Sequence, residues 1–226
     1  MSRPINEVLL VTDVNPNSPI SESYRALRTN TQFAAAGRLT QVIAVTSCEQ
    51  SEGKTTTVAN LAISFAQEGK KTLLIDADLR KPGQHKAFSI SNRKGLSNYL
   101  AAQNELEQSL AATHIEHLTL LPAGQIPPNP AELLSSKRMD ELLQKVREEY
   151  EIILIDTPPV LAVTDAQIAA AKSDGVLLVL RAGKVKKGQA TKAKAALEHV
   201  GSRILGLVIN DKKKSPGDYA YYEYGN

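Results

Sequence analysis

Six short, mostly apolar runs are spread along the chain and are separated by longer stretches with helical periodicity. The runs are residues 41–46, 71–76, 118–121, 151–156, 175–180 and 204–210. Nearly continuous apolar runs of this length are typical of strands that are buried on both faces of a parallel sheet. The helical stretches, which supply the crossovers that parallel strands need, are residues 54–68, 95–102, 130–149, 165–172 and 187–200. The pattern predicts an α/β fold with a mostly parallel central sheet flanked by helices.

Composition excludes several other classes of protein. The hydrophobic fraction of 42% is too high for a disordered chain, and no uncharged apolar stretch reaches the roughly 18 residues that span a bilayer. The amino-terminal residues lack the pattern of a secretory signal, and a single cysteine, Cys48, leaves no intrachain disulfide. We therefore expect a cytoplasmic protein. The net charge of +3 demands no basic face, so no nucleic-acid partner is expected.

A predicted strand-to-helix turn carries the sequence SCEQSEGKTT at residues 47–56. In a phosphate-binding loop, backbone N–H groups cradle the phosphates, a lysine contacts the β and γ oxygens, and a Thr hydroxyl binds Mg²⁺. The pattern gives these roles to Lys54 and Thr55. The residues expected at the nucleotide are Ser51, Glu52, Gly53, Lys54, Thr55 and Thr56. Cys48 replaces the first Gly of the general motif, so an ordinary Thr-rich helix start is the alternative for this segment alone.

Three aspartates follow two further predicted strands. Asp76 and Asp156 end their strands, and Asp78 lies just beyond the first of them. Ligands of open α/β sheets bind at the carboxyl ends of strands, where these aspartates would meet the phosphate loop. Each aspartate alone is compatible with strand-end solvation or helix capping, but the three together predict a Mg²⁺–nucleotide site. The expected metal-site residues are Thr55, Asp76 and Asp156.

Three segments resemble the Walker A, Walker A′ and Walker B motifs of bacterial tyrosine kinases: GKTT at 53–56, LLIDADLRKP at 73–82 and IILIDTPP at 152–159. The resemblance is to the stand-alone cytoplasmic kinases of Gram-positive bacteria and covers nearly the whole chain, including IPPNPAELL at 126–134. It implies the deviant P-loop fold that these kinases share with partition-type and division-site ATPases. Those ATPases usually carry an extra Lys early in the loop, where this chain has Glu49, which favours the kinases.

The resemblance implies transfer of the ATP γ-phosphate to tyrosine with the help of Mg²⁺. The implied catalytic residues are Lys54, Asp76, Asp78 and Asp156. Lys54 and the metal neutralise developing charge, Asp156 holds the metal through water, and Asp76 or Asp78 accepts or orients the tyrosine proton. Asn210 resembles a position that contacts the nucleobase, and a strand-terminating Asn is the alternative. Arg80 and Lys81 are compatible with a phosphate or acceptor contact and equally with a solvated turn.

The two ends of the chain differ from the middle. Residues 1–40 form a predicted helical oligomerisation segment, because E-x-x-R-x-x-R at Glu22, Arg25 and Arg28 resembles the kinases' ring-forming motif; a solvated helix face is the alternative. Residues 41–210 form the predicted nucleotide-binding kinase domain. Residues 211–226 are predicted to be a flexible tail, and they contain the tyrosines Tyr219, Tyr221, Tyr222 and Tyr224.

The tyrosine cluster is a candidate substrate. A tail of about 16 residues reaches at most about 50 Å when extended and roughly 20–25 Å as a coil, so a neighbouring subunit is within its range. We therefore expect autophosphorylation in trans on the four tail tyrosines, with a docking peptide as the alternative. Each phosphate adds about −1.5 to −2 charge, so four reverse the net charge and would weaken a ring of subunits.

The resemblance also implies a cellular role. A kinase of this type regulates the synthesis or export of a capsular or other exopolysaccharide, and it works with a membrane-embedded activator of the chain-length-determinant type. That activator would recruit the chain to the inner face of the cell membrane, and other protein tyrosines are further candidate substrates. The alternatives are a partition- or division-type ATPase switch without kinase activity, and a nucleotide-binding scaffold.

Overall fold

The computed structural model describes residues 10–34 and 40–212. Its sheet has seven strands in the order β3-β4-β2-β5-β1-β6-β7. The strands are β1 (Val42–Ser47), β2 (Thr72–Asp76), β3 (Ala111–Ala112), β4 (Leu118–Leu121), β5 (Ile152–Asp156), β6 (Gly175–Arg181) and β7 (Ile204–Asn210). Every neighbouring pair is parallel except β3 with β4. The predicted fold and all six predicted strands are confirmed, and β3 is a two-residue pairing too short to leave a pattern in the sequence.

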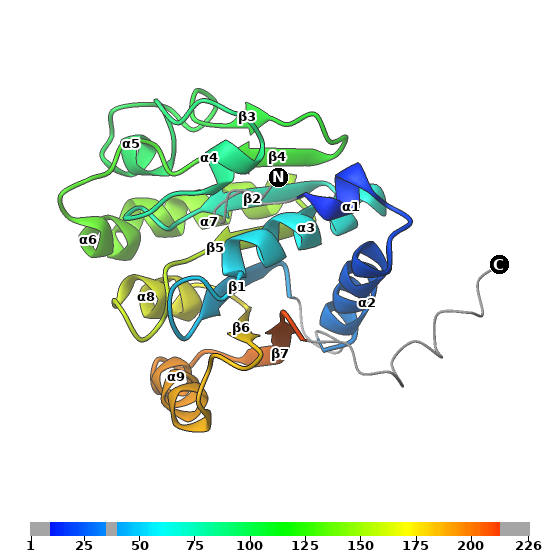
Figure 1. Ribbon diagram of the computed structural model, residues 1–226. Helices are drawn as coiled ribbons and strands as arrows, with labels where there is room; N and C mark the ends of the chain where they lie inside the picture. The colour runs from blue at the N-terminus through cyan, green and yellow to red at the C-terminus, as the bar shows by residue number, and fades with distance from the viewer. Residues whose placement is uncertain (1–9, 35–39, 213–226) are drawn as a thin grey trace, which may run out of the picture.

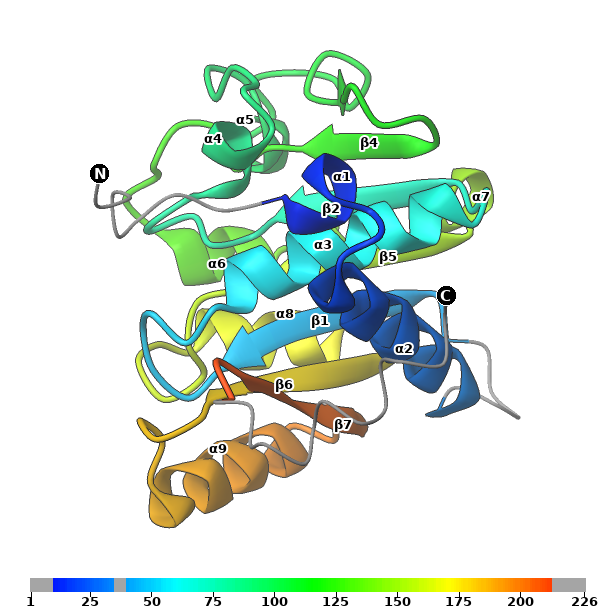
Figure 2. The same ribbon diagram turned by 45° about the vertical axis from the view of Figure 1, so that its right-hand side comes forward.

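Helices cover both faces of this sheet. They are α1 (Val11–Val14), α2 (Pro19–Ala34), α3 (Lys54–Gln67), α4 (Gln84–Ala87), α5 (Leu96–Leu100), α6 (Pro130–Ser135), α7 (Lys137–Glu149), α8 (Asp165–Ala171) and α9 (Lys187–His199). Figures 1 and 2 show α1, α2 and α3 on one face and α7, α8 and α9 on the other. Within the described residues, no helix is both long enough and apolar enough to cross a bilayer.

The central strands are buried on both faces, as their continuous apolar runs predict. In β1, Ile43 and Val45 pack in the cluster that contains α3, while Val42 and Ala44 pack in the cluster of the opposite face. Helix α3 is itself covered, because α1 and α2 pack against it. The helix that follows the phosphate loop is therefore held between the sheet and an outer layer, which restricts the loop's position.

The structure divides the helix predicted at 130–149. Ser136 has φ −64° and ψ 157°, an extended conformation, and it separates α6 from α7. Its hydroxyl donates to the carbonyl of Leu133 at 2.6 Å. Serine competes with helical hydrogen bonds in this way and favours helix ends, so the break follows from local side-chain chemistry that helical periodicity does not reveal.

The charged motif residues Glu22, Arg25 and Arg28 lie on α2, and Arg28 is turned inward. Arg25 pairs with Glu22 on the same helix at 2.6 Å. Arg28 instead donates to the carbonyl of Ser64 at 2.8 Å and lies 3.5 Å from Glu68, so its side chain is only 16% exposed. The packing of α2 against α3 causes this difference, because it brings the end of α3 within reach of Arg28.

Candidate active site

The motif residues meet at one edge of the sheet because of the strand order. Strand β5 lies between β2 and β1, and all three run in the same direction. Asp76 and Asp156 are direct partners in the register of β2 with β5, and both are fully buried. The phosphate loop leaves the end of β1 at the same edge. The structure thus places the three predicted motifs together.

The phosphate loop adopts a conformation that requires its glycine. Gly53 has φ +90°, and a Cβ added there would lie 1.9 Å from Nδ2 of Asn210. The Asn210 amide donates to the carbonyl oxygen of Glu52 at 3.0 Å. Ser51 is also in the left-handed region, with φ 62°. Asn210, at the end of β7, therefore packs directly against the predicted nucleotide loop.

A buried carboxylate, Glu52, binds the backbone at the start of the loop. Glu52 is 1% exposed and accepts a hydrogen bond from the backbone N–H of Cys48 at 3.0 Å. Burial raises the pKa of Glu52. The Cys48 thiol is buried, and burial together with the charges of Glu52 and Glu49 raises its pKa to about 11. Such a thiol is unreactive at neutral pH, so the geometry favours a space-filling role for Cys48.

Lys54 begins α3, and its ammonium group lies among the carboxylates. Nζ is 3.0 Å from Oδ2 of Asp78 and 3.7 Å from Oδ1 of Asp156, and it donates to the Thr55 hydroxyl at 3.2 Å. Burial acts to lower the pKa of Lys54, but the charges of Asp156 and Asp78 outweigh it, so the pKa lies above its ordinary value. Lys54 therefore stays protonated and offsets the negative charge of the cluster. Thr56 follows in the same helical turn and is half-buried.

Both aspartates at the strand ends have a raised pKa. Burial and the charge of Asp156 raise the pKa of Asp76 to about 8. Burial also raises the pKa of Asp156, and Lys54 opposes that rise. Two adjacent buried carboxylates cannot both ionise cheaply. In the metal-free chain the two carboxylates therefore share a proton, and the Lys54 ammonium offsets the charge that remains.

The arrangement fits a magnesium ion. Oδ1 of Asp156 is buried and makes no hydrogen bond. It lies 3.7 Å from Nζ of Lys54, which in turn contacts the Thr55 hydroxyl. Mg²⁺ prefers oxygen ligands and is commonly bound through one or two carboxylates, with water and substrate phosphates completing its shell. In the part of the chain that the structure describes, no group of three or more His, Cys, Asp or Glu residues forms a metal site by itself.

Gln84 is a site residue that the sequence pattern does not mark. It is fully buried, and its side-chain amide donates to Asp156 and to the carbonyl oxygen of Thr55. Its backbone N–H, like that of Gly83, donates to Oδ2 of Asp76 at 3.0 Å. A single glutamine in a short turn carries no periodic or motif signal. Only its placement beside the strand ends reveals it.

Arg80 and Lys81 have separate partners. Arg80 makes a two-pronged contact with Asp165 at the start of α8, with N–O distances of 2.9 and 3.0 Å. Lys81 donates to the side-chain oxygen of Gln50 in the phosphate loop at 3.1 Å. Neither a solvated turn nor a phosphate contact describes Arg80 in this structure. The pair instead ties the segment after β2 to α8.

Replacing Arg80 with Ala is expected to lower the free energy of unfolding by about 2 kcal/mol, because Asp165 is fully buried and would lose its charged partner. The value is below the cost of breaking a fully buried pair, since the Arg80 side chain is 42% exposed. Urea unfolding measures the loss. The control is Asp165→Asn, which leaves no buried charge and should cost less than Arg80→Ala. A larger loss for Asp165→Asn contradicts this account.

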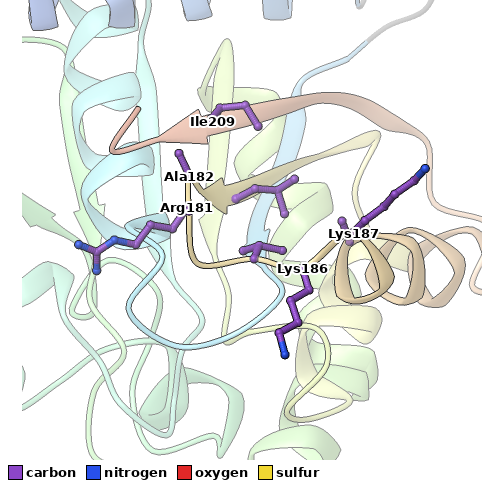
Figure 3. Close-up of a pocket in the computed structure, with 9 residues that line it drawn as sticks. Arg181, Ala182, Lys186, Lys187 and Ile209 are labelled. Atoms are coloured by element: carbon purple, nitrogen blue, oxygen red, sulfur yellow. The ribbon is translucent and has the colours of Figure 1, made fainter. Parts of the chain in front are cut away.

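The connection between β6 and α9 contacts the phosphate loop from the other side. Lys184 donates to the carbonyl of Gln50 at 2.5 Å, and Arg181 donates to the carbonyl of Ser51 at 3.3 Å. Beside this connection lies a groove of about 290 Å³, bounded by the end of β6, the start of α9 and Ile209 of β7 (Figure 3). The lysine and aspartate cluster does not line this groove, so the site chemistry lies at the loop and strand ends rather than in it.

Comparison with known proteins identifies the family. A protein-family model described as an AAA domain matches residues 40–198. The tyrosine-protein kinase YwqD of Bacillus subtilis (strain 168) is 49% identical over 222 residues, which cover 98% of this chain and 93% of YwqD. The chain belongs to the bacterial tyrosine kinases.

Solved structures place this bacterial tyrosine kinase within the wider fold. The kinase domain of the Escherichia coli tyrosine kinase ETK matches with a TM-score of 0.89 and 34% identity, covering 96% of this chain and 84% of that one. The septum site-determining protein MinD of Pyrococcus horikoshii OT3, solved with Mg-ADP, matches with a TM-score of 0.67 and 25% identity, covering 78% and 72%. The predicted kinship with division-site ATPases is confirmed at the level of fold, and the predicted enzyme class, a protein-tyrosine kinase, is confirmed by family membership.

The predicted site residues of this bacterial tyrosine kinase fall into three groups. The structure gathers the residues of the loop, the strand ends and Asn210 at one edge of the sheet. Glu22, Arg25 and Arg28 lie on α2, on the outer side of α3. The tail tyrosines Tyr219, Tyr221, Tyr222 and Tyr224 lie outside the described residues.

Proposed function

We propose that this chain is an ATP- and Mg²⁺-dependent autokinase that phosphorylates its carboxy-terminal tyrosine cluster in trans. The observation that carries the proposal is the Lys54 ammonium, whose side chain is 12% exposed, in contact with Asp78 and Asp156 beside the phosphate loop. Phosphoryl transfer asks a protein mainly to position the reactants and to neutralise developing charge. The phosphate loop would position the nucleotide through its N–H groups. Lys54 and the carboxylates around it would position and neutralise the reacting groups.

The cluster suggests a division of labour among its residues. Lys54 would leave its carboxylate partners for the ATP phosphates and neutralise their charge. Thr55, Asp156 and Asp76 would hold Mg²⁺, which when bound neutralises further charge on the phosphates. Asp78 is the better candidate to orient the tyrosine hydroxyl, because it is 5% exposed whereas Asp76 is fully buried. Oδ2 of Asp78 would become available when Lys54 moves to the phosphates. The Ser51–Thr56 backbone and Asn210 would hold the nucleotide.

The position at which the tail begins supports phosphorylation in trans. Asn210 contacts the phosphate loop, so residues 211–226 begin at the edge of the sheet that carries the site. A segment of about 16 residues that starts there spans roughly 20–25 Å as a flexible coil, which is long enough to reach the same site of a neighbouring subunit.

The proposal includes an assembly and a cellular setting. Residues 1–40 would join subunits into a ring through Glu22, Arg25 and Arg28, residues 41–210 would form the catalytic domain, and residues 211–226 would be the substrate tail. Since Arg28 already binds Ser64 and Glu68 of its own chain, Glu22 and Arg25 would carry most of the contact between subunits. A membrane-embedded activator would recruit the ring to the inner face of the membrane, where its phosphorylation state would regulate exopolysaccharide synthesis or export.

Mixing a chain that lacks a working site with a chain that lacks the tail tyrosines tests transfer in trans. One chain carries Lys54→Met and an intact tail, and the other carries an intact site and all four tail tyrosines replaced by Phe. With ATP, Mg²⁺ and the activator's cytoplasmic segment, we expect phosphotyrosine on the Lys54→Met chain, which a size tag distinguishes. Each chain alone should give at least about tenfold less phosphotyrosine than the mixture. Label that never appears in the mixture, although the wild type labels itself, would show transfer in cis, and phosphate release without phosphotyrosine in the wild type would indicate an ATPase.

A further inference from the structure

One buried residue, Gln84, connects all three motifs of the site. Nε2 of Gln84 lies 2.8 Å from Oδ2 of Asp156 and 3.1 Å from the carbonyl oxygen of Thr55. The backbone N–H of Gln84 lies 3.0 Å from Oδ2 of Asp76. Gln84 thereby links the first turn of α3 to the ends of β2 and β5. Because it is fully buried, water does not compete for these contacts.

The Gln84 amide decides which oxygen of Asp156 remains available. Nε2 takes Oδ2, while Oδ1 is buried, makes no hydrogen bond and lies 3.7 Å from Nζ of Lys54. A carboxylate is nearly two-fold symmetric about its terminal torsion, so Asp156 by itself does not distinguish its two oxygens. The amide removes that symmetry and holds the free oxygen on the side of Lys54.

We propose that Gln84 is a positioning residue for the Mg²⁺–nucleotide complex, acting through Asp156. The inference rests on the metal site of the proposed function. The Gln84 amide keeps Oδ1 of Asp156 on the side where it would meet the metal or its bound water, and it fixes Asp156 relative to the Thr55 turn. Partners that orient metal-binding carboxylates typically change metal affinity or activity by about 10–100-fold.

The contacts of Gln84 allow the side chain to be tested separately from the backbone. Gln84→Leu removes the amide but keeps the backbone N–H that binds Asp76. Gln84→Glu also removes the donors and places a further carboxylate against Asp156, so it should be more damaging than Gln84→Leu. A role in packing alone would rank the two variants by their fit to the cavity and would not involve magnesium.

Nucleotide binding with and without magnesium is the decisive measurement. A fluorescent ADP analogue is titrated into the full chain in Mg²⁺ and in EDTA. We expect Gln84→Leu to lower the affinity in Mg²⁺ by about tenfold and to change the affinity in EDTA by less than about twofold, with kcat for tail phosphorylation falling about 10–100-fold. If Gln84→Leu does not fold by circular dichroism, Gln84→Met, which is closer in length, takes its place in the same comparison.

A buried amide whose hydrogen bonds go to residues outside the site provides the control. Asn98 in α5 is 7% exposed, and its amide donates to Gln103 at 2.9 Å. Asn98→Leu should lower the thermal midpoint and leave the ratio of affinities in Mg²⁺ and EDTA unchanged. An unchanged ratio in Gln84→Leu overturns the proposal, as does an equal loss in Asn98→Leu. If the wild type binds the analogue equally well in Mg²⁺ and in EDTA, the metal site itself is overturned. If the wild type binds more tightly in Mg²⁺ but forms no phosphotyrosine, only the kinase assignment is overturned.

Discussion

Replacing Lys54 with Met is expected to lower tyrosine phosphorylation by this chain about a thousandfold. Lys54 is the cation that contacts both Asp78 and Asp156, and it lies at the start of the helix behind the phosphate loop. A methionine of similar length fills the space but leaves the phosphates and the carboxylates facing one another without the ammonium between them. Mass spectrometry of the tail after incubation with ATP and Mg²⁺ measures the loss.

An exposed lysine separates this effect from a general change in charge. Lys192 lies on the exposed surface of α9, and Lys192→Met should phosphorylate the tail at the rate of the wild type. Lys54→Met itself should remain folded near neutral pH, because the neighbouring carboxylates can take up protons when the lysine is gone. Tail phosphorylation by Lys54→Met within tenfold of the wild type would show that Lys54 is not the neutralising group.

Replacing Asp76 with Asn is expected to lower tail phosphorylation by about a hundredfold or more. The same change should flatten the pH dependence of stability in the metal-free chain. Burial and Asp156 raise the pKa of Asp76 from 3.8 to about 8. Between these values the folded chain holds a proton that the unfolded chain releases, so the free energy of unfolding falls as pH rises. The stabilisation is complete below about pH 4 and is lost as pH rises through about 8, a change of a few kcal/mol.

Urea unfolding in EDTA at pH 5 to 9 measures this dependence. The wild type should become steadily less stable over most of the range, and Asp76→Asn should show a much smaller slope because its side chain does not ionise. Asp140, an exposed carboxylate on α7, provides the control, and Asp140→Asn should keep the wild-type slope. A wild type as stable at pH 9 as at pH 5 would mean that Asp76 is ionised in the folded chain throughout.

The fold was predictable because its elements repeat short-range patterns. A run such as 175–180, apolar at every position, is compatible with burial on two faces, and β6 is indeed buried there. The boundaries of α3 and α9 were predicted to within a residue or so for the same reason. The break at Ser136 and the short α4 were not predictable from periodicity, because a hydroxyl that donates to a carbonyl of the preceding helix and a four-residue helix leave no repeating signal.

The sequence by itself determined which chemistry the chain carries. Gly53, Lys54 and Thr55 follow an apolar strand, and Asp76 and Asp156 end two others, so any parallel sheet built from these strands presents them at its carboxyl edge. Only the tertiary structure decided that β5 lies between β2 and β1, which places Asp76 opposite Asp156 and brings Gln84 between them. The physical reason is range: periodicity and turn chemistry are properties of neighbouring residues, whereas strand order and the sharing of a proton between buried carboxylates depend on contacts across the whole core.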